Sequence, residues 1–188
     1  MNNEQPDYHC LIVGAGFSGI GAAIKLDQEG FGDYLVVEAG DEVGGTWYWN
    51  TYPGIAVDIP SFSYQYSFEQ RPDWSRTYAH GNELKAYAEH CADKYGIRPK
   101  IRFNTKVVAA EFDDQRALWR VQTDPGVGAP PACGGEVTAR FLFNASGVLT
   151  VPPFSGTLKS SLRDAPPLIT KVPSGASAIP IGPRMPSL

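Results

Sequence analysis

The chain has 188 residues and a formal net charge of −4. This length suits one good core, or one domain and a piece of another, and the sequence lacks the clustered Lys and Arg that a nucleic-acid-binding surface needs. The longest apolar stretch, residues 11–24, is short and contains four glycines, so we expect no membrane span.

The first elements along the chain predict a βαβ unit. The run "YHCLIV", residues 8–13, is typical of a strand, and the turn "GAGFSG" leads into a helix that we expect to end near Glu29, before Gly30. A second strand, "YLVVE", follows at residues 34–38. The order of strand, helix and strand indicates an α/β fold.

The next segment, "GGTWYWNTYPGIAVD" at residues 44–58, fits neither a helix nor a strand. It places Trp47, Tyr48 and Trp49 next to one another in an irregular loop. Such rings bury large areas only where something flat or apolar meets them. We therefore expect a ligand, a second domain or a local core to cover them.

Residues 81–95 predict an amphipathic helix, with Asn82 as a possible cap and Gly96 after its end. Three strand-like runs follow, "KVVAAEF", "LWRVQT" and "EVTARFLFNAS", and they predict a small β-meander inserted before the last core strand. Residues 151–188 hold eight of the sixteen prolines. We therefore expect an ordered domain over residues 1–155 and an irregular, Pro-rich tail over residues 156–188.

The three cysteines, Cys10, Cys91 and Cys133, are widely separated and form no CxxC pair. We interpret them as reduced thiols of a cytoplasmic protein, with a disulfide framework as the alternative. No basic region precedes an apolar stretch at the start of the chain, so we expect no signal peptide. The histidines share no ligand spacing with one another or with the cysteines, which argues against a metal site.

Gly14, Gly16 and Gly19 form a GxGxxG motif between the first strand and the helix. The first glycine allows a tight turn, the second lets the backbone approach a pyrophosphate, and the third lets helix and strand pack closely. Glu38 ends the second strand, where a carboxylate can accept both hydroxyls of an adenosine ribose. An acid there disfavours a 2′-phosphate, so we predict FAD or NAD rather than NADP, with a merely glycine-rich turn as the alternative.

The GxGxxG unit, the aromatic loop and the residues Ala145, Ser146 and Gly147 together resemble the class B flavin monooxygenases. The loop is most similar to the Baeyer–Villiger branch, and "ASG" is similar to the family's "ATG" linker. The resemblance covers residues 8 to about 156. It implies a Rossmann-like FAD-binding domain of the two-dinucleotide-binding type, with FAD and NADPH as cofactors and dioxygen and a small-molecule ketone or heteroatom compound as substrates.

By matching position, the resemblance implies a set of cofactor-binding residues. Gly16, Ser18 and Glu38 would hold the ADP half, and Gly45, Thr46 and Trp47 would run beside the flavin. Asp58 and Tyr64 would lie at loop positions around the cofactors, and Val107 would contact adenine through its backbone. The set is Gly14, Gly16, Phe17, Ser18, Gly19, Glu38, Gly45, Thr46, Trp47, Asp58, Tyr64 and Val107. A purely local core is the alternative for the aromatic loop, and an ordinary solvated acid is the alternative for Asp58. No side chain is identified as a nucleophile or general base.

Two features of the family are not intact in this sequence. The FxGxxxHxxxW fingerprint does not follow residues 154–156, and only "GASAI" at residues 175–179 matches half of a second dinucleotide motif. We therefore predict the FAD-binding portion of an NADPH-dependent monooxygenase, inactive on its own, with a non-catalytic FAD- or ADP-binding fragment as the alternative. A plain NAD-dependent reductase would lack its Tyr-x-x-x-Lys pair and would leave the aromatic loop unexplained.

Overall fold

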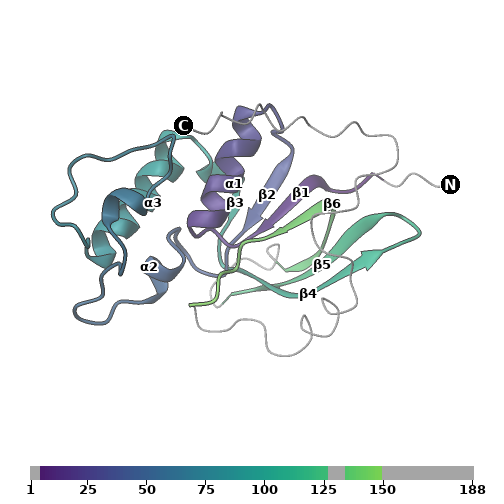
Figure 1. Cartoon of the computed structure of the whole chain (residues 1–188). Helices are drawn as coiled ribbons and strands as arrows, with labels where there is room; N and C mark the ends of the chain where they lie inside the picture. The colour runs from purple at the N-terminus through teal and green to yellow at the C-terminus, as the bar shows by residue number, and fades with distance from the viewer. Residues whose placement is uncertain (1–4, 127–133, 150–188) are drawn as a thin grey trace.

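The structure, a computed structural model, describes residues 5–126 and 134–149. Six strands form one sheet in the order β3-β2-β1-β6-β5-β4 (Figure 1). Strands β3, β2, β1 and β6 run parallel, whereas β6, β5 and β4 pair antiparallel. Their bounds are β1 Tyr8–Val13, β2 Tyr34–Val37, β3 Ile101–Arg102, β4 Thr105–Asp113, β5 Leu118–Pro125 and β6 Gly135–Asn144. The predicted α/β class is confirmed.

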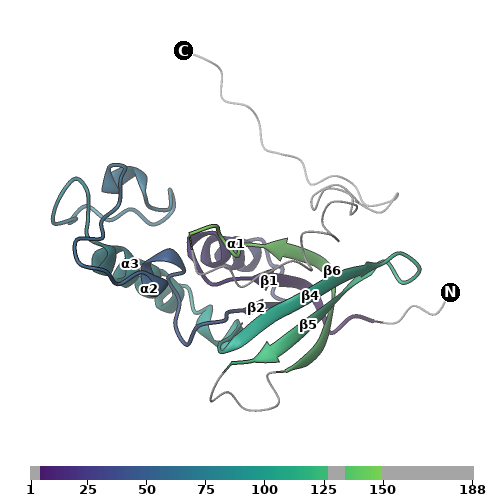
Figure 2. The ribbon, with the colours of Figure 1, turned by 90° about the horizontal axis from the view of Figure 1, so that it is seen from below.

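Helices α1 (Phe17–Gln28) and α3 (Gly81–Lys94) pack on one face of the sheet. Alternate residues of the central strands, such as Ile12 of β1, join this helical core, while their neighbours, such as Leu11, point to the opposite face. Apolar residues of β4 and β5 cover that second face. The hairpin of these two strands lies on the side of the parallel strands that faces away from α1 (Figure 2). Strands β1 and β2 are therefore buried on both sides near their carboxyl ends.

Strand β6 belongs both to the meander and to the parallel strands, which the sequence predicts as separate parts of the chain. Its first half pairs antiparallel with β5, from Gly135 to Ala139, and its second half pairs parallel with β1, from Ala139 to Asn144. The predicted meander is therefore not an insertion before the last core strand. It shares that strand, so the meander and the parallel strands form one continuous sheet.

Two local expectations were wrong, and one strand was missed. The aromatic stretch contains a helical turn, α2 (Thr46–Trp49), and the predicted cap of α3 is replaced by His80, because Asn82 lies inside the helix. The short strand β3 was not predicted. Two 3₁₀ turns, η1 (Ser61–Ser63) and η2 (Arg98–Lys100), lie in the connections. The predicted tail, residues 156–188, lies outside the described residues.

Cys10 and Cys91 are free thiols, and Cys133 lies outside the described residues. Burial raises the pKa of both described thiols to about 11, which keeps them protonated and unreactive near neutral pH. In the described part of the chain no group of three or more His, Cys, Asp or Glu could hold a metal ion. No helix within these residues is long and apolar enough to cross a membrane.

Glu69 joins the segment before α3 to the helix itself. Its carboxylate accepts hydrogen bonds from Lys94 at 2.7 Å and from Tyr95 at 3.0 Å, and it contacts the His90 ring nitrogen at 3.0 Å. The bonds from Lys94 and His90 lower the pKa of Glu69 from 4.5 to about 2. This ionised carboxylate therefore stabilises the fold at pH values above its ordinary pKa.

We expect the contribution of Glu69 to the free energy of unfolding to be full above pH 4.5 and to be lost as the pH falls toward 2. In Glu69→Gln this pH-dependent part should be missing. Urea unfolding of the wild type and the variant across that range measures the difference. Glu29→Gln, at an exposed residue after α1, is the matched control. A gap between wild type and Glu69→Gln that stays constant with pH would contradict this assignment.

Candidate dinucleotide-binding site

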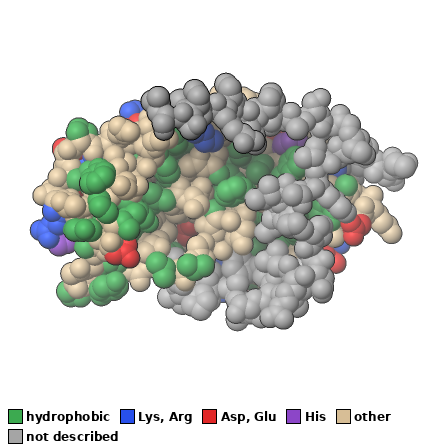
Figure 3. Space-filling view, in the orientation of Figure 1, with side chains coloured by type: hydrophobic (Ala, Val, Ile, Leu, Met, Phe, Trp, Pro, Cys, Tyr) green, Lys and Arg blue, Asp and Glu red, His purple; other side chains and the backbone are tan. Residues whose placement is uncertain are grey.

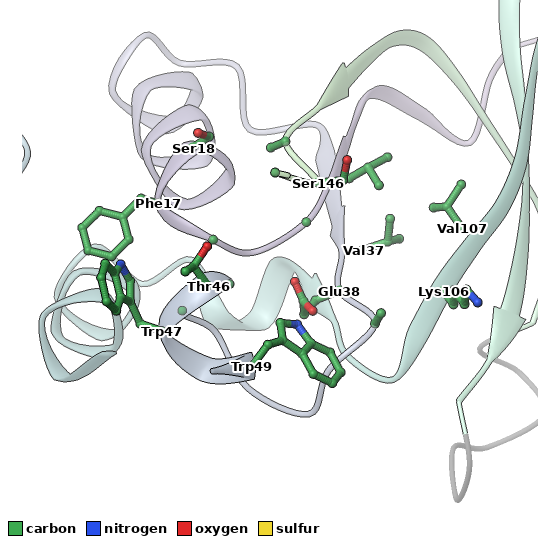
Figure 4. A pocket seen from close by; sticks show the side chains of 18 of the residues that line it. Phe17, Ser18, Val37, Glu38, Thr46, Trp47, Trp49, Lys106, Val107 and Ser146 are labelled. Carbon is green, nitrogen blue, oxygen red and sulfur yellow. The ribbon is translucent and has the colours of Figure 1, made fainter. Parts of the chain in front are cut away.

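A cleft of about 490 Å³ lies at the carboxyl ends of β1 and β2 (Figure 4). Ligands of open α/β sheets bind at this edge, and the volume is in the range of small-molecule sites. Five segments contribute most of its wall: the β1–α1 turn, the loop after β2, α2, the start of β4 and the chain after β6. Tyr64, after η1, and Gly126, after β5, complete the wall. The lining residues are Val13, Gly14, Gly16, Phe17, Ser18, Val37, Glu38, Ala39, Gly44, Gly45, Thr46, Trp47, Trp49, Tyr64, Thr105, Lys106, Val107, Gly126, Ala145, Ser146 and Gly147.

The GxGxxG turn brings the backbones of β1, α1 and the chain after β6 into contact. Gly14 has a φ of +100°, and a Cβ there would lie 2.7 Å from the Ala145 carbonyl oxygen. A Cβ on Gly19 would lie 1.8 Å from the Gly14 carbonyl oxygen. Helix α1 begins after Gly16 with no side-chain cap, and its first residues line the cleft. The N–H groups of its first turn lack intrahelical partners, so the helix offers donors to an anion.

A second close backbone contact joins this turn to the aromatic loop. A Cβ on Gly45 would lie 2.8 Å from the Gly16 Cα, and Gly45 has a φ of +54°. The N–H of Gly44 donates to the Ala15 carbonyl oxygen at 3.0 Å. The two glycines of the loop therefore let its backbone pass directly against the turn at one side of the cleft.

Glu38 is only 5% exposed, and its carboxylate is held by two backbone donors. The N–H of Ala15 donates to one oxygen at 2.7 Å, and the N–H of Gly40 donates to the other at 2.8 Å. Each carboxylate oxygen can accept two hydrogen bonds, so each keeps one acceptor position. Because Glu38 lines the cleft, this arrangement suits a ligand with two neighbouring hydroxyl groups.

The aromatic residues of the loop differ in what covers them. Trp47 packs with Val57 and Leu84, and its indole N–H donates to the Tyr64 hydroxyl at 3.3 Å. A local core therefore accounts for Trp47. Trp49 lines the cleft and is 41% exposed, and Tyr52 is 62% exposed. Hydrophobic side chains gather on this side of the molecule, over α2 and the segments near α3 (Figure 3).

Comparisons with known proteins agree with this geometry. The family "NAD(P)-binding Rossmann-like domain" matches residues 12–81. A Baeyer–Villiger monooxygenase from Streptomyces coelicolor is 38% identical over 152 residues, which make up 80% of this chain and 28% of that protein. A second one, from Pseudomonas aeruginosa, is 39% identical over 148 residues, or 78% of this chain and 27% of that protein. This chain is homologous to the Baeyer–Villiger monooxygenases.

A solved structure supports the same relationship. The structure described as OTEMO in an FAD-bound form has a TM-score of 0.70 and 37% identity, and the match covers 79% of this chain and 27% of that one. The chain therefore spans little more than a quarter of the length of these relatives. The Rossmann-like fold expected from the sequence is confirmed for the matched part.

The structure brings most of the predicted cofactor-binding residues together. All of them line the cleft except Gly19 and Asp58. Gly19 lies beneath the turn, against the Gly14 carbonyl group, where it has a packing role. Asp58 is exposed outside the cleft lining, which is the position of an ordinary solvated acid. The predicted cofactor-binding role of Asp58 stays a prediction.

Several residues of the cleft wall were not predicted from the sequence. Thr105 and Lys106 come from β4, and Gly126 directly follows β5. They reach the cleft because the hairpin of β4 and β5 curls under the parallel strands (Figure 2). No motif around these residues predicts that they line the cleft. Val13 and Val37 are different, because they end the first two predicted strands. The rule that ligands bind at the carboxyl ends of parallel strands would have identified them.

Proposed function

We propose that this chain forms the FAD-binding portion of an NADPH-dependent flavin monooxygenase of the Baeyer–Villiger or N- and S-oxygenating type. The observation that carries the proposal is the buried Glu38 carboxylate, with a free acceptor position on each oxygen, in the same cleft as an uncapped helix N-terminus. An adenosine diphosphate presents a ribose diol and a pyrophosphate, which are the two groups that this cleft suits.

Named residues would hold the two halves of FAD. The pyrophosphate would lie at the start of α1, beside Gly16 and Ser18, while Glu38 would accept the ribose hydroxyls. The adenine would contact the backbone of Val107, which lines the cleft from β4. The flavin half would extend toward Gly45, Thr46 and Trp47, which line the cleft on the side of the aromatic loop.

The protein's part is to bind, orient and exclude water. Bound FAD would supply the redox chemistry, taking electrons from NADPH and passing oxygen from dioxygen to a ketone or a soft heteroatom. Trp47 and Tyr64 give the cleft a rigid apolar wall through their mutual hydrogen bond and their packing with Phe17. The cytoplasmic location expected from the reduced cysteines stays a prediction.

Spectroscopy of the purified 188-residue chain after incubation with FAD and removal of free flavin tests the proposal. We expect a flavin spectrum that belongs to the protein. Anaerobic addition of NADPH then separates the alternatives. Bleaching above the rate of free flavin indicates a reductase half-reaction, whereas a stable yellow protein favours a non-catalytic FAD-binding fragment. A protein that retains no flavin but binds NAD would contradict the proposal.

We expect Glu38→Gln to weaken FAD binding by about 1–3 kcal/mol, the scale of hydrogen bonds lost from a charged group in an enclosed site. The amide would place an NH₂ group against the N–H of Ala15 or Gly40, where the carboxylate now accepts. A fluorescence titration with FAD gives the dissociation constant. Glu111→Gln, at an exposed residue of β4, is the matched control. Equal affinities in wild type and Glu38→Gln would place the ribose contact elsewhere.

A further inference from the structure

The backbone beside the cleft forms a closed series of contacts. From the Gly16–Gly45 contact the series follows α2 to Asn50, crosses to Leu149, and returns along the residues after β6 to Ala145. There the N–H of Ala145 donates to the Val13 carbonyl oxygen at 2.8 Å, and β1 leads back to the GxGxxG turn. Several members of this series line the cleft, among them Gly16, Thr46, Trp49 and Ser146. A ligand in the cleft would therefore lie beside a closed series of contacts, which the backbone makes everywhere except at the Asn50 side chain.

One side chain makes the link between α2 and the chain after β6. The Asn50 amide group donates to the Thr46 carbonyl oxygen at 2.8 Å and to the Leu149 carbonyl oxygen at 3.1 Å. The first bond is local to α2, whereas the second joins positions 99 residues apart. Figures 1 and 2 both show the chain after β6 running toward α2. In Figure 4 the side chain of Glu38 is seen between Ser146, in the chain after β6, and Trp49, in α2.

The Asn50–Leu149 link is the weakest in this series. The Gly16–Gly45 contact is supported by a backbone hydrogen bond between Gly44 and Ala15, and Ala145 is tied into the parallel pairing of β6 with β1. By contrast, the bond to Leu149 is a single neutral hydrogen bond at the surface, where water competes for both groups. Local opening of the series would therefore begin at this link.

We propose that Asn50 is a positioning residue that acts as a latch on the cleft. Its bond to Leu149 holds α2 and the chain after β6 together at the cleft, and breaking that bond lets a dinucleotide enter or leave. The identity of the ligand rests on the proposed function. The latch itself rests on the geometry of Asn50, Thr46 and Leu149.

The first test is the rate at which FAD dissociates from the reconstituted chain. We expect Asn50→Ala to release FAD about tenfold faster than the wild type, which corresponds to about 1.4 kcal/mol. Asn82→Ala is the matched control, because this exposed asparagine lies on α3, outside the cleft lining. Thermal unfolding of each variant without FAD shows whether the change acts through global stability instead.

The second test uses Asn50→Asp. If Asn50 had a merely structural role, this variant would behave like Asn50→Ala. An ionised carboxylate accepts only, so it loses both bonds and repels the carbonyl oxygens of Thr46 and Leu149, whereas the protonated acid can donate again. We expect the dissociation rate of Asn50→Asp, divided by the wild-type rate, to fall as the pH is lowered from neutral toward the ordinary aspartate pKa of about 3.9. The charged groups around α2 in the described chain, Glu38, Asp41 and Lys85, are common to both proteins, so the ratio isolates the new carboxyl group.

A ligand-free measurement separates failure of the latch from failure of the proposed function. We expect Asn50→Ala to increase amide hydrogen exchange in residues 45–52 and in residues 145–149 together, while Asn82→Ala leaves both segments unchanged. If the wild type takes up no FAD, the proposed function fails and this exchange comparison still decides the latch. Unchanged exchange in both segments, or FAD release from Asn50→Ala at the wild-type rate, would overturn the inference.

Discussion

Gly19→Ala is expected to destabilise the fold by more than about 3 kcal/mol, the upper end of ordinary overpacking costs. A Cβ at this position would lie 1.8 Å from the Gly14 carbonyl oxygen, which belongs to the backbone and cannot rotate away. Helix α1 would have to move off β1, and its apolar face, including Ile20 and Ile24, would lose packing in the core. Urea unfolding followed by circular dichroism measures the loss.

Gly32→Ala is the matched control for this change. A Cβ on Gly32 would meet only the flexible ends of Lys100 at 3.5 Å and Asp27 at 4.0 Å, so the variant should fold with nearly wild-type stability. A Gly19→Ala protein as stable as Gly32→Ala would show that α1 does not pack against the turn as the structure describes.

Gly16→Val is expected to keep the fold but to weaken FAD binding by about a hundredfold or more, which is about 2.8 kcal/mol. A Cβ on Gly16 would make an ordinary contact of 3.4 Å with the Gly45 Cα, so alanine fits the turn. The two further methyl groups of valine would crowd the start of α1, where the pyrophosphate should lie. Flavin content after reconstitution, with thermal unfolding as the check on folding, measures the effect.

Gly16→Ala provides the graded comparison for this variant. It should fall between the wild type and Gly16→Val in flavin content, because it adds one carbon at the edge of the cleft. Wild-type flavin content in a folded Gly16→Val protein would mean that the phosphate site lies elsewhere in the molecule.

The βαβ unit could be predicted because its signals are local. The GxGxxG spacing, the apolar strand before it and the acid at Glu38 all lie within about thirty residues of one another, and the geometry of such a unit is constrained by chirality and packing. The structure places the first two strands and α1 within a residue or two of the expected bounds. The position of Glu38 in the cleft follows from the same local rules.

The remaining features depend on contacts between distant segments. The double pairing of β6 is set by β1 and β5, and no periodicity in residues 135–144 indicates it. Helix α2 is a single turn, too short to show a helical repeat. The cleft contacts of Thr105 and Lys106, and the bond from Asn50 to Leu149, arise only when the hairpin and the chain after β6 fold against the first unit.

The most direct measurement of the central claim is a competition titration of the 188-residue chain with FAD, followed by flavin fluorescence. The ADP half of FAD carries the ribose diol and the pyrophosphate that Glu38 and the start of α1 suit, so ADP should displace FAD. FMN lacks the adenosine ribose and should displace it far less effectively. Displacement by FMN but not by ADP, or no binding of FAD at all, would contradict the assignment of this cleft.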